Sequence, residues 1–205
     1  TADYYVSALP VENMRDLVTP AMISAEPTLG EIHRLNLAWM NGIQFFLAND
    51  VPIVHGHVTY DDSPFALTSI SQRQFWPDVD FGGLGDGRVG GILSVDISDW
   101  DTPGILYGKP ANQLTAEEVK DEVWAQMKAH LNQYGQVRLQ DKDVLSWFLD
   151  PDVVAPNRGV EGINLEPTLI NTAGSWAWRP EAVTGIDNLF LASDYVRTNT
   201  DLASM

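Results

Sequence analysis

A short apolar run near the end of the chain, residues 189–192, most constrains the fold. It lies between turn-forming residues and is followed directly by Ser193 and Asp194. Such a run is typical of a buried strand in a parallel sheet that is covered on both faces. A carboxylate that directly follows such a strand lies at its carboxyl end, where open α/β sheets bind ligands. The polar residues after Asp194 predict a loop that leads to a helix N-terminus, so we expect a ligand site here.

The whole segment 188–205 resembles the carboxyl-terminal flavin motif of the FAD-dependent amine oxidase and carotenoid desaturase superfamily. That motif is an apolar strand, then Ala-Gly-Asp, a polar loop, and Ser-Met-Glu-Gly-Ala opening a helix. Ser193 departs from the usual glycine and slightly crowds the backbone near the cofactor. Upstream, Arg179-Pro180, Thr184 and Asn188 are similar to the plant and cyanobacterial type of carotene desaturase.

The resemblance implies a fold of the α+β or α/β class. Residues 1–10 and 166–205 would be parts of an FAD-binding, Rossmann-like domain. Residues 11–165 would be an inserted substrate-binding domain with an antiparallel or mixed sheet plus helices. The start of the chain, through Pro10, is similar to the strand that returns to the FAD domain in these enzymes, and it reads as a buried strand.

The same resemblance assigns the residues that would contact FAD. Ala8, Leu9 and Pro10 would lie beside the pyrophosphate. The alternative is that they belong to an ordinary core strand with no role in binding. Asp194 would accept a hydrogen bond from a ribityl hydroxyl. The backbone of Ser204 and Met205 would approach the pyrimidine edge of the flavin.

An aromatic residue beside the flavin is a further implication of the resemblance. Trp176 aligns best with that position and Trp178 second. Residues two apart share one face of an extended strand, so both would point the same way. The alternative is a tryptophan that fills the boundary between domains.

Charge and composition exclude several functions. The 205 residues carry a formal net charge of −16 and contain no cysteine. Such an acidic surface repels phosphate backbones, which argues against nucleic-acid binding, and it offers no polybasic attraction to anionic lipid. No apolar run approaches the roughly 20 residues of a membrane-spanning helix, and no signal peptide is visible. We therefore expect a cytoplasmic location, with peripheral membrane contact only if the substrate is a lipid.

The middle of the chain predicts strands at 37–47, 51–60 and 65–70, forming an antiparallel meander. Its apolar inner face would line a channel for an isoprenoid or another apolar substrate; packing against helices is an equal alternative. A capping box, Thr115 with Glu118, begins a helix through about residue 134. Residues 141–149 predict a second helix.

Two motifs in this region resemble binding sites but lack the context that such sites need. Gly85, Gly87 and Gly90 form a G-x-G-x-x-G pattern, but a strand follows it instead of a helix, so it is not a dinucleotide-binding turn. His55 and His57 would share one face of a strand and so suit a metal, yet no third ligand lies at a suitable spacing.

Together these observations predict an FAD-dependent oxidoreductase that dehydrogenates an apolar, isoprenoid-like substrate by hydride transfer to flavin. The alternatives are a flavin amine oxidase, a non-catalytic structural piece, and an isoprenoid-binding module without redox chemistry. No catalytic acid or base can be named. The family's amino-terminal FAD fingerprint is absent, so we expect a fragment that needs the missing N-terminal part of the same protein and is inactive by itself.

Overall fold

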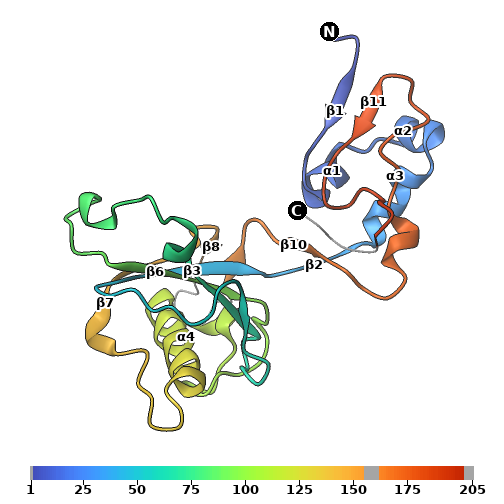
Figure 1. Cartoon of the computed structure of the whole chain (residues 1–205). Coiled ribbons are helices and arrows are strands. Elements are labelled where there is room, and N and C mark those ends of the chain that lie inside the picture. Colours follow the sequence, from blue (N-terminus) through green and yellow to red (C-terminus); the bar gives the residue numbers. More distant parts are fainter. Residues whose placement is uncertain (1, 155–161, 201–205) are drawn as a thin grey trace. The chain divides into compact units, whose positions relative to one another are not determined.

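The computed structural model describes residues 2–154 and 162–200 (Figure 1). The chain divides into two compact units. The terminal unit comprises Thr1–Ala38 and Pro167–Met205, and the central unit comprises Trp39–Glu166. The result is a mixed α/β chain with several small sheets and few helices, which fits part of a flavin-binding domain joined to a second domain.

The boundary between the units differs from the one expected after Pro10. Residues 11–38 belong to the terminal unit because their helices bury apolar side chains in its core. Val11 and Met14 pack there with Leu29, and the same core contains Leu191 and Tyr195 from the end of the chain.

The terminal unit contains two small sheets and several short helices. Strands β1 and β11 pair in parallel, and β2 pairs with β10 in an antiparallel arrangement. Its elements are β1 (Tyr5–Ser7), α1 (Val11–Leu17), α2 (Pro20–Ala25), α3 (Thr28–Glu31), η1 (Ile32–Arg34), β2 (Asn36–Ala38), β10 (Thr168–Ile170), η6 (Ser175–Trp178) and β11 (Leu189–Leu191), where η marks a 3-10 helix.

Strand β1 forms where the sequence predicts it, but it is not buried. Tyr5 is 48% exposed and Val6 is 65% exposed, although their side chains point to opposite faces of the strand. A strand that is apolar on both faces is normally covered on both. Within the described residues, β1 has a strand partner only on the β11 side.

The central unit is a five-stranded antiparallel sheet in the order β4-β5-β6-β3-β7. Helix α4 lies on one side of the sheet, and the segment between β5 and β6 lies on the other (Figure 1). The elements are β3 (Asn41–Leu47), β4 (Val58–Thr59), β5 (Leu67–Ser71), η2 (Gln72–Phe75), η3 (Phe81–Gly83), β6 (Gly91–Ile97), η4 (Ala111–Gln113), α4 (Ala116–Leu131), η5 (Asp141–Asp143), β7 (Val144–Leu149), β8 (Val153–Val154) and β9 (Ile163–Asn164).

Alternation along the strands of the central unit determines which face is buried. In β3, Ile43, Phe45 and Leu47 are buried under α4, and Phe45 lies 4.9 Å from Trp124 of that helix between ring centroids. Each such side chain contributes about 1.5–3 kcal/mol when it is fully buried.

Helix α4 begins with the predicted capping box. The Thr115 hydroxyl accepts from the Glu118 backbone N–H at 3.2 Å, and the Glu118 carboxylate accepts from the Thr115 N–H at 2.9 Å. Two N–H groups at the helix start are thereby satisfied. This local prediction is confirmed.

Other local predictions for the central unit are wrong. Residues 141–149 form η5 and strand β7 instead of a helix, because Val144–Leu149 pairs along β3. The predicted strand 51–60 retains only β4. The predicted meander is also wrong, because β6 separates β3 from β5 and so from β4. Short apolar runs fit either period, and the pairing partner decides between them.

Candidate functional site

The parallel pairing of β1 with β11 brings the two ends of the chain to a common edge. Ser7 lies opposite Leu191, and the Ala192 N–H donates to the Ser7 carbonyl at 2.8 Å. The residues that leave β1 and those that leave β11 therefore emerge at the same carboxyl edge. Such an edge is where α/β sheets bind ligands.

The β1 side of this edge is open. Ala8 is exposed, Leu9 is 39% exposed, and Pro10 is half-buried at the start of α1. The resemblance implies that these residues lie beside a cofactor. They follow β1 at the edge where Ala192 to Asp194 follow β11, and they lie outside strand β1 itself.

Asp194 is half-buried on the β11 side of the edge. Its Oδ1 atom accepts from the Ser193 hydroxyl at 3.1 Å, so Ser193 orients the carboxylate. Within the described part of the chain, the Oδ2 atom accepts no hydrogen bond. An oriented carboxylate with one oxygen available can accept a hydrogen bond from a hydroxyl of a ligand.

Arg179 anchors the backbone of Asp194 and was not among the predicted site residues. Its side chain is only 1% exposed; one guanidinium nitrogen donates to the Asp194 carbonyl at 3.3 Å, and another donates to the Asn171 side-chain oxygen. A buried arginine held in this way resists movement of the loop after β11. The signal for it in the sequence is the Arg179-Pro180 pair, which by itself indicates only a similarity to one type of carotene desaturase.

Tyr195, the next residue along the chain, lies in the core of the terminal unit. Its side chain is fully buried. Burial raises the pKa of its phenol; interaction with the Ser7 hydroxyl lowers the pKa in part, and the charge of Asp194 raises it further. The phenol therefore stays neutral at physiological pH.

Trp176 lies in the 3-10 helix η6 and not in an extended strand, which corrects the expectation for both tryptophans. Its indole N–H donates to the Thr198 carbonyl at 3.1 Å, and the Arg197 guanidinium lies 4.5 Å from its ring centroid. Trp176 thus holds the loop after Asp194 and is 38% exposed. Trp178 instead stacks with Arg34 at 4.7 Å.

The turn before β11 is closed by Thr184. Its hydroxyl donates to the Leu189 carbonyl at 2.8 Å and accepts from the Ile186 N–H at 3.1 Å. Thr184 and Arg179 are two of the residues that resemble one type of desaturase. The hydrogen bonds of both side chains are made to other residues of this chain, so these bonds hold the fold and do not bind a substrate. Ser204 and Met205 lie outside the described residues.

The sequence profile of the flavin-containing amine oxidoreductases matches residues 1–202. The chain belongs to this family. Its cofactor is FAD, and its activity is that of a flavin-dependent oxidoreductase. A search of curated proteins found no relative.

The edge of this amine oxidoreductase-family chain fits an FAD in part. Ala8 and Ala192 are small and exposed, so the backbone of both strand ends is accessible, and Asp194 offers an available carboxylate oxygen. The glycine pattern at residues 85–90 plays no part in this edge, because it belongs to the central unit and leads into strand β6 without opening a helix.

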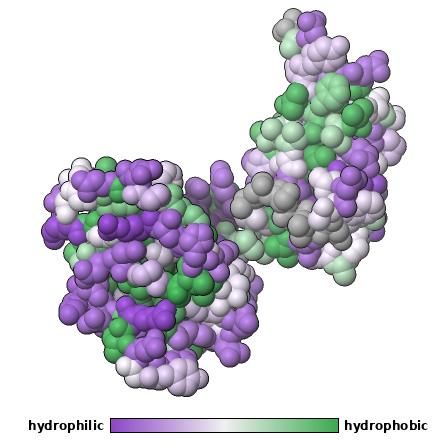
Figure 2. All heavy atoms as spheres, in the orientation of Figure 1, coloured by the Kyte–Doolittle hydropathy of each residue, from purple (hydrophilic) through white to green (hydrophobic). Residues whose placement is uncertain are grey.

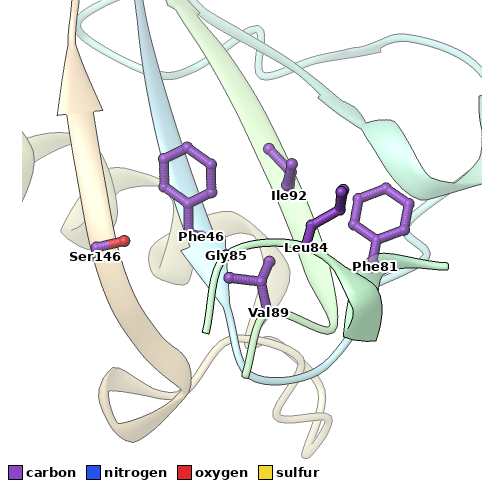
Figure 3. A pocket seen from close by; sticks show the side chains of 7 residues that line it. All are labelled: Phe46, Phe81, Leu84, Gly85, Val89, Ile92 and Ser146. Atoms are coloured by element: carbon purple, nitrogen blue, oxygen red, sulfur yellow. The ribbon is translucent and has the colours of Figure 1, made fainter. Parts of the chain in front are cut away.

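The central unit carries an apolar groove on the sheet face opposite α4 (Figure 3). The groove has a volume of about 290 Å³. Its lining residues are Phe46, Phe81, Leu84, Gly85, Val89, Ile92 and Ser146. The expectation that the apolar inner face lines a channel is therefore wrong, because α4 fills that face; the open face is the outer one.

The two histidines near this sheet do not lie on a strand, contrary to expectation. His55 lies in a bend and His57 directly precedes β4, and the His55 ring lies 5.7 Å from the Phe75 ring. Across residues 2–154 and 162–200 there is no group of three or more acidic, histidine or cysteine side chains that could hold a metal ion. In the same ranges, no helix is long and apolar enough to cross a bilayer.

Proposed function

We propose that this chain is part of an FAD-dependent oxidoreductase that dehydrogenates an apolar, isoprenoid-like substrate. The observation that carries the proposal is the parallel pairing of β1 with β11 in a chain of the flavin-containing family. Because of this pairing, Ala8–Pro10 and Ser193–Asp194 leave the two strands at the same edge. Bound FAD would supply the redox chemistry by accepting hydride from the substrate.

In this proposal the terminal unit is the cofactor-binding part. The Asp194 carboxylate would accept a hydrogen bond from a ribityl hydroxyl of FAD, since Ser193 orients the carboxylate and Arg179 fixes the backbone of Asp194. Trp176 would present an aromatic ring beside the flavin. The residues that complete this set are Ala8, Leu9 and Pro10 near the pyrophosphate, and Ser204 and Met205 at the pyrimidine edge.

The exposed apolar side chains of β1, and of Tyr4 just before it, support a further partner for the terminal unit. Tyr4, Tyr5 and Val6 are 69%, 48% and 65% exposed. Covering both faces would remove these side chains from water at about 25 cal/mol per Å². We propose that the N-terminal part of the same protein supplies this cover and completes the FAD site, and that the 205 residues alone are inactive.

The central unit is the substrate-binding part in this proposal. Its groove is lined mainly by aromatic and aliphatic side chains, which suits a hydrocarbon substrate. Amine oxidation is the second candidate, favoured by the family itself. The buried contacts of Arg179 and Thr184 account for both residues without reference to a substrate, so they do not favour desaturation over amine oxidation.

The first experiment is a visible absorption spectrum of the full-length gene product, which includes the N-terminal part, purified without added cofactor and again after addition of FAD. Flavin bands that remain after gel filtration are expected. A protein that stays colourless after FAD is added would overturn the proposal and leave a structural or lipid-binding role.

A pair of variants then tests the cofactor edge. Asp194→Asn removes the charged acceptor and should weaken FAD binding about tenfold, because a hydrogen bond to a charged group contributes about 1.5–3 kcal/mol. Asp187→Asn is the matched control, since Asp187 is exposed and precedes β11. Equal FAD affinities for the two variants would exclude Asp194 as a ligand.

A further inference from the structure

The loop that follows Asp194 carries a positive charge, that of Arg197. The Arg197 backbone N–H donates to the Pro180 carbonyl at 2.7 Å. On its other side, the Thr198 carbonyl accepts from the indole N–H of Trp176 at 3.1 Å. Both bonds hold the loop without using the Arg197 side chain, so the backbone of the loop itself fixes where this charge begins.

The guanidinium of Arg197 is held against the ring of Trp176. It lies 4.5 Å from the ring centroid, a distance at which the ring attracts a cation. One guanidinium nitrogen also donates to the Ala177 carbonyl at 2.9 Å. The Arg197 side chain is only 24% exposed. The charge is therefore kept at one place, beside an aromatic ring and partly removed from water.

The charge of Arg197 is poorly compensated by the protein. Across the residues that the structure describes, the carboxylate within ion-pair distance is that of Glu181, which lies 3.4 Å away and is itself 64% exposed. Such an exposed pair contributes little. The Nε–H group of Arg197 is buried and finds no acceptor in the described part of the chain. Because a buried donor normally has an acceptor, the site favours an additional negative group.

A second arginine–tryptophan pair in the same unit is arranged differently. The Arg34 guanidinium lies 4.7 Å from the ring centroid of Trp178, two residues along η6 from Trp176. Arg34 is 58% exposed, and its guanidinium lies 2.7 Å from the Glu31 carboxylate. The two pairs share their chemistry, but the charge of Arg34 has a close partner and more contact with water.

The chain as a whole is strongly negative. Its formal net charge is −16, and hydrophilic residues cover much of the face that Figure 2 shows. The summed field of such a protein opposes the addition of negative charge to a bound ligand. A cation fixed next to the ligand acts against this field at short range.

From these contacts we infer that Arg197 raises the reduction potential of the bound flavin. The inference rests on the proposed function, in which Trp176 lies beside the flavin and the loop after Asp194 belongs to the cofactor site. At neutral pH a reduced flavin carries more negative charge than an oxidised one. A fixed cation therefore stabilises the reduced form more than the oxidised form, and a charge near the ring system is one of the ways in which a protein tunes a flavin.

The test is a redox titration of the full-length gene product loaded with FAD, followed by visible absorbance. Arg197→Gln removes the charge and keeps a polar side chain, and the loop retains its bonds to Pro180 and Trp176. At a given potential it should lower the ratio of reduced to oxidised flavin threefold to tenfold, which is a midpoint about 15–30 mV lower for a two-electron couple. Arg197→Lys keeps the charge and should restore most of the shift.

Arg34→Gln is the matched control, since it removes the same group from the neighbouring tryptophan. We expect it to leave the midpoint potential unchanged. The FAD dissociation constant and the melting temperature of each variant are measured beside the potential. A purely structural role of Arg197 would change these two quantities in the Gln and the Lys variants alike and would leave the potential as it is.

The inference is overturned if Arg197→Gln keeps the wild-type potential, if Arg197→Lys lowers it as far as Arg197→Gln does, or if Arg34→Gln lowers it equally. In these three cases the protein still holds FAD, so the proposed function stands and only the role of Arg197 is lost. A full-length protein that takes up no FAD overturns both.

Discussion

Replacing the buried carboxylate of Glu122 should destabilise the central unit more than any other single-charge change in α4. Glu122 is fully buried, and its two oxygens accept from the N–H groups of Ile105, Leu106 and Tyr107 at 2.6, 2.8 and 3.0 Å. It also accepts from the Gln126 side chain at 3.0 Å. One carboxylate therefore holds a whole turn of the 101–110 loop against the helix.

Glu122→Gln keeps the shape of the side chain but turns one acceptor oxygen into a donor. Each oxygen now accepts two of the four bonds, so two charge-assisted bonds are lost. Hydrogen bonds to charged groups contribute about 1.5–3 kcal/mol each. The loop can turn part of its backbone to water, so we expect a net loss of about 3 kcal/mol, which lowers the melting temperature by about 10 °C.

Differential scanning calorimetry of the variant beside Glu117→Gln is the assay. Glu117 is exposed in the first turn of the same helix, and its change should cost less than about 1 kcal/mol. Melting temperatures within about 2 °C of each other would refute the anchoring role of Glu122. Gly104→Ala gives a second check, since its Cβ would lie 2.3 Å from the Glu122 Cδ atom. Combined with Glu122→Ala, this substitution should cost less than the sum of the single changes.

Three further outcomes are expected. Gly90→Ala should destabilise the central unit by about 2 kcal/mol or more in urea unfolding, because the new Cβ would lie 2.3 Å from the Ala48 carbonyl oxygen; an unchanged midpoint would contradict this. Glu26 has a lowered pKa, chiefly because the Thr28 hydroxyl donates to its carboxylate. A carboxylate with a lowered pKa in the folded state stabilises the folded protein at pH values above its unfolded-state pKa. This stabilisation is lost as the pH falls through the folded-state pKa. The advantage in melting temperature over Glu26→Gln should therefore be present at pH 7 and disappear as pH falls from about 4.5 through the folded pKa; a pH-independent gap would exclude this linkage. Thr115→Ala should cost about 1 kcal/mol, measured by thermal unfolding, and Thr115→Ser should restore most of the loss.

Features that depend on a few neighbouring residues were predictable. The capping box at Thr115 and the helix that follows it need only contacts within one turn, and they form as expected. The strands β1 and β11, and Asp194 directly after β11, also follow from short local patterns. The resemblance at the chain's end led to the family, and the profile match confirms that level and no finer one.

Features that depend on distant partners were not predictable from the same patterns. Residues 144–149 have a spacing that also suits a helix, and only the edge of β3 makes them a strand. The same holds for Trp176, whose 3-10 helix is stabilised by bonds to a loop about twenty residues away. From the sequence alone, Arg179 would be expected at the surface. In the structure it is buried and donates hydrogen bonds to Asn171 and Asp194.

By itself, the sequence determined the family, the cofactor, the strand before Asp194 and the secure helix α4, because each depends on residues adjacent in the chain. The tertiary structure decided which polar groups meet. It paired β1 with β11 so that Ala8 and Asp194 share an edge, and it filled the inner sheet face with α4 so that the outer face remained open. The physical reason is that strand pairing and burial act between segments more than a hundred residues apart, while local pattern shows only what each segment can become.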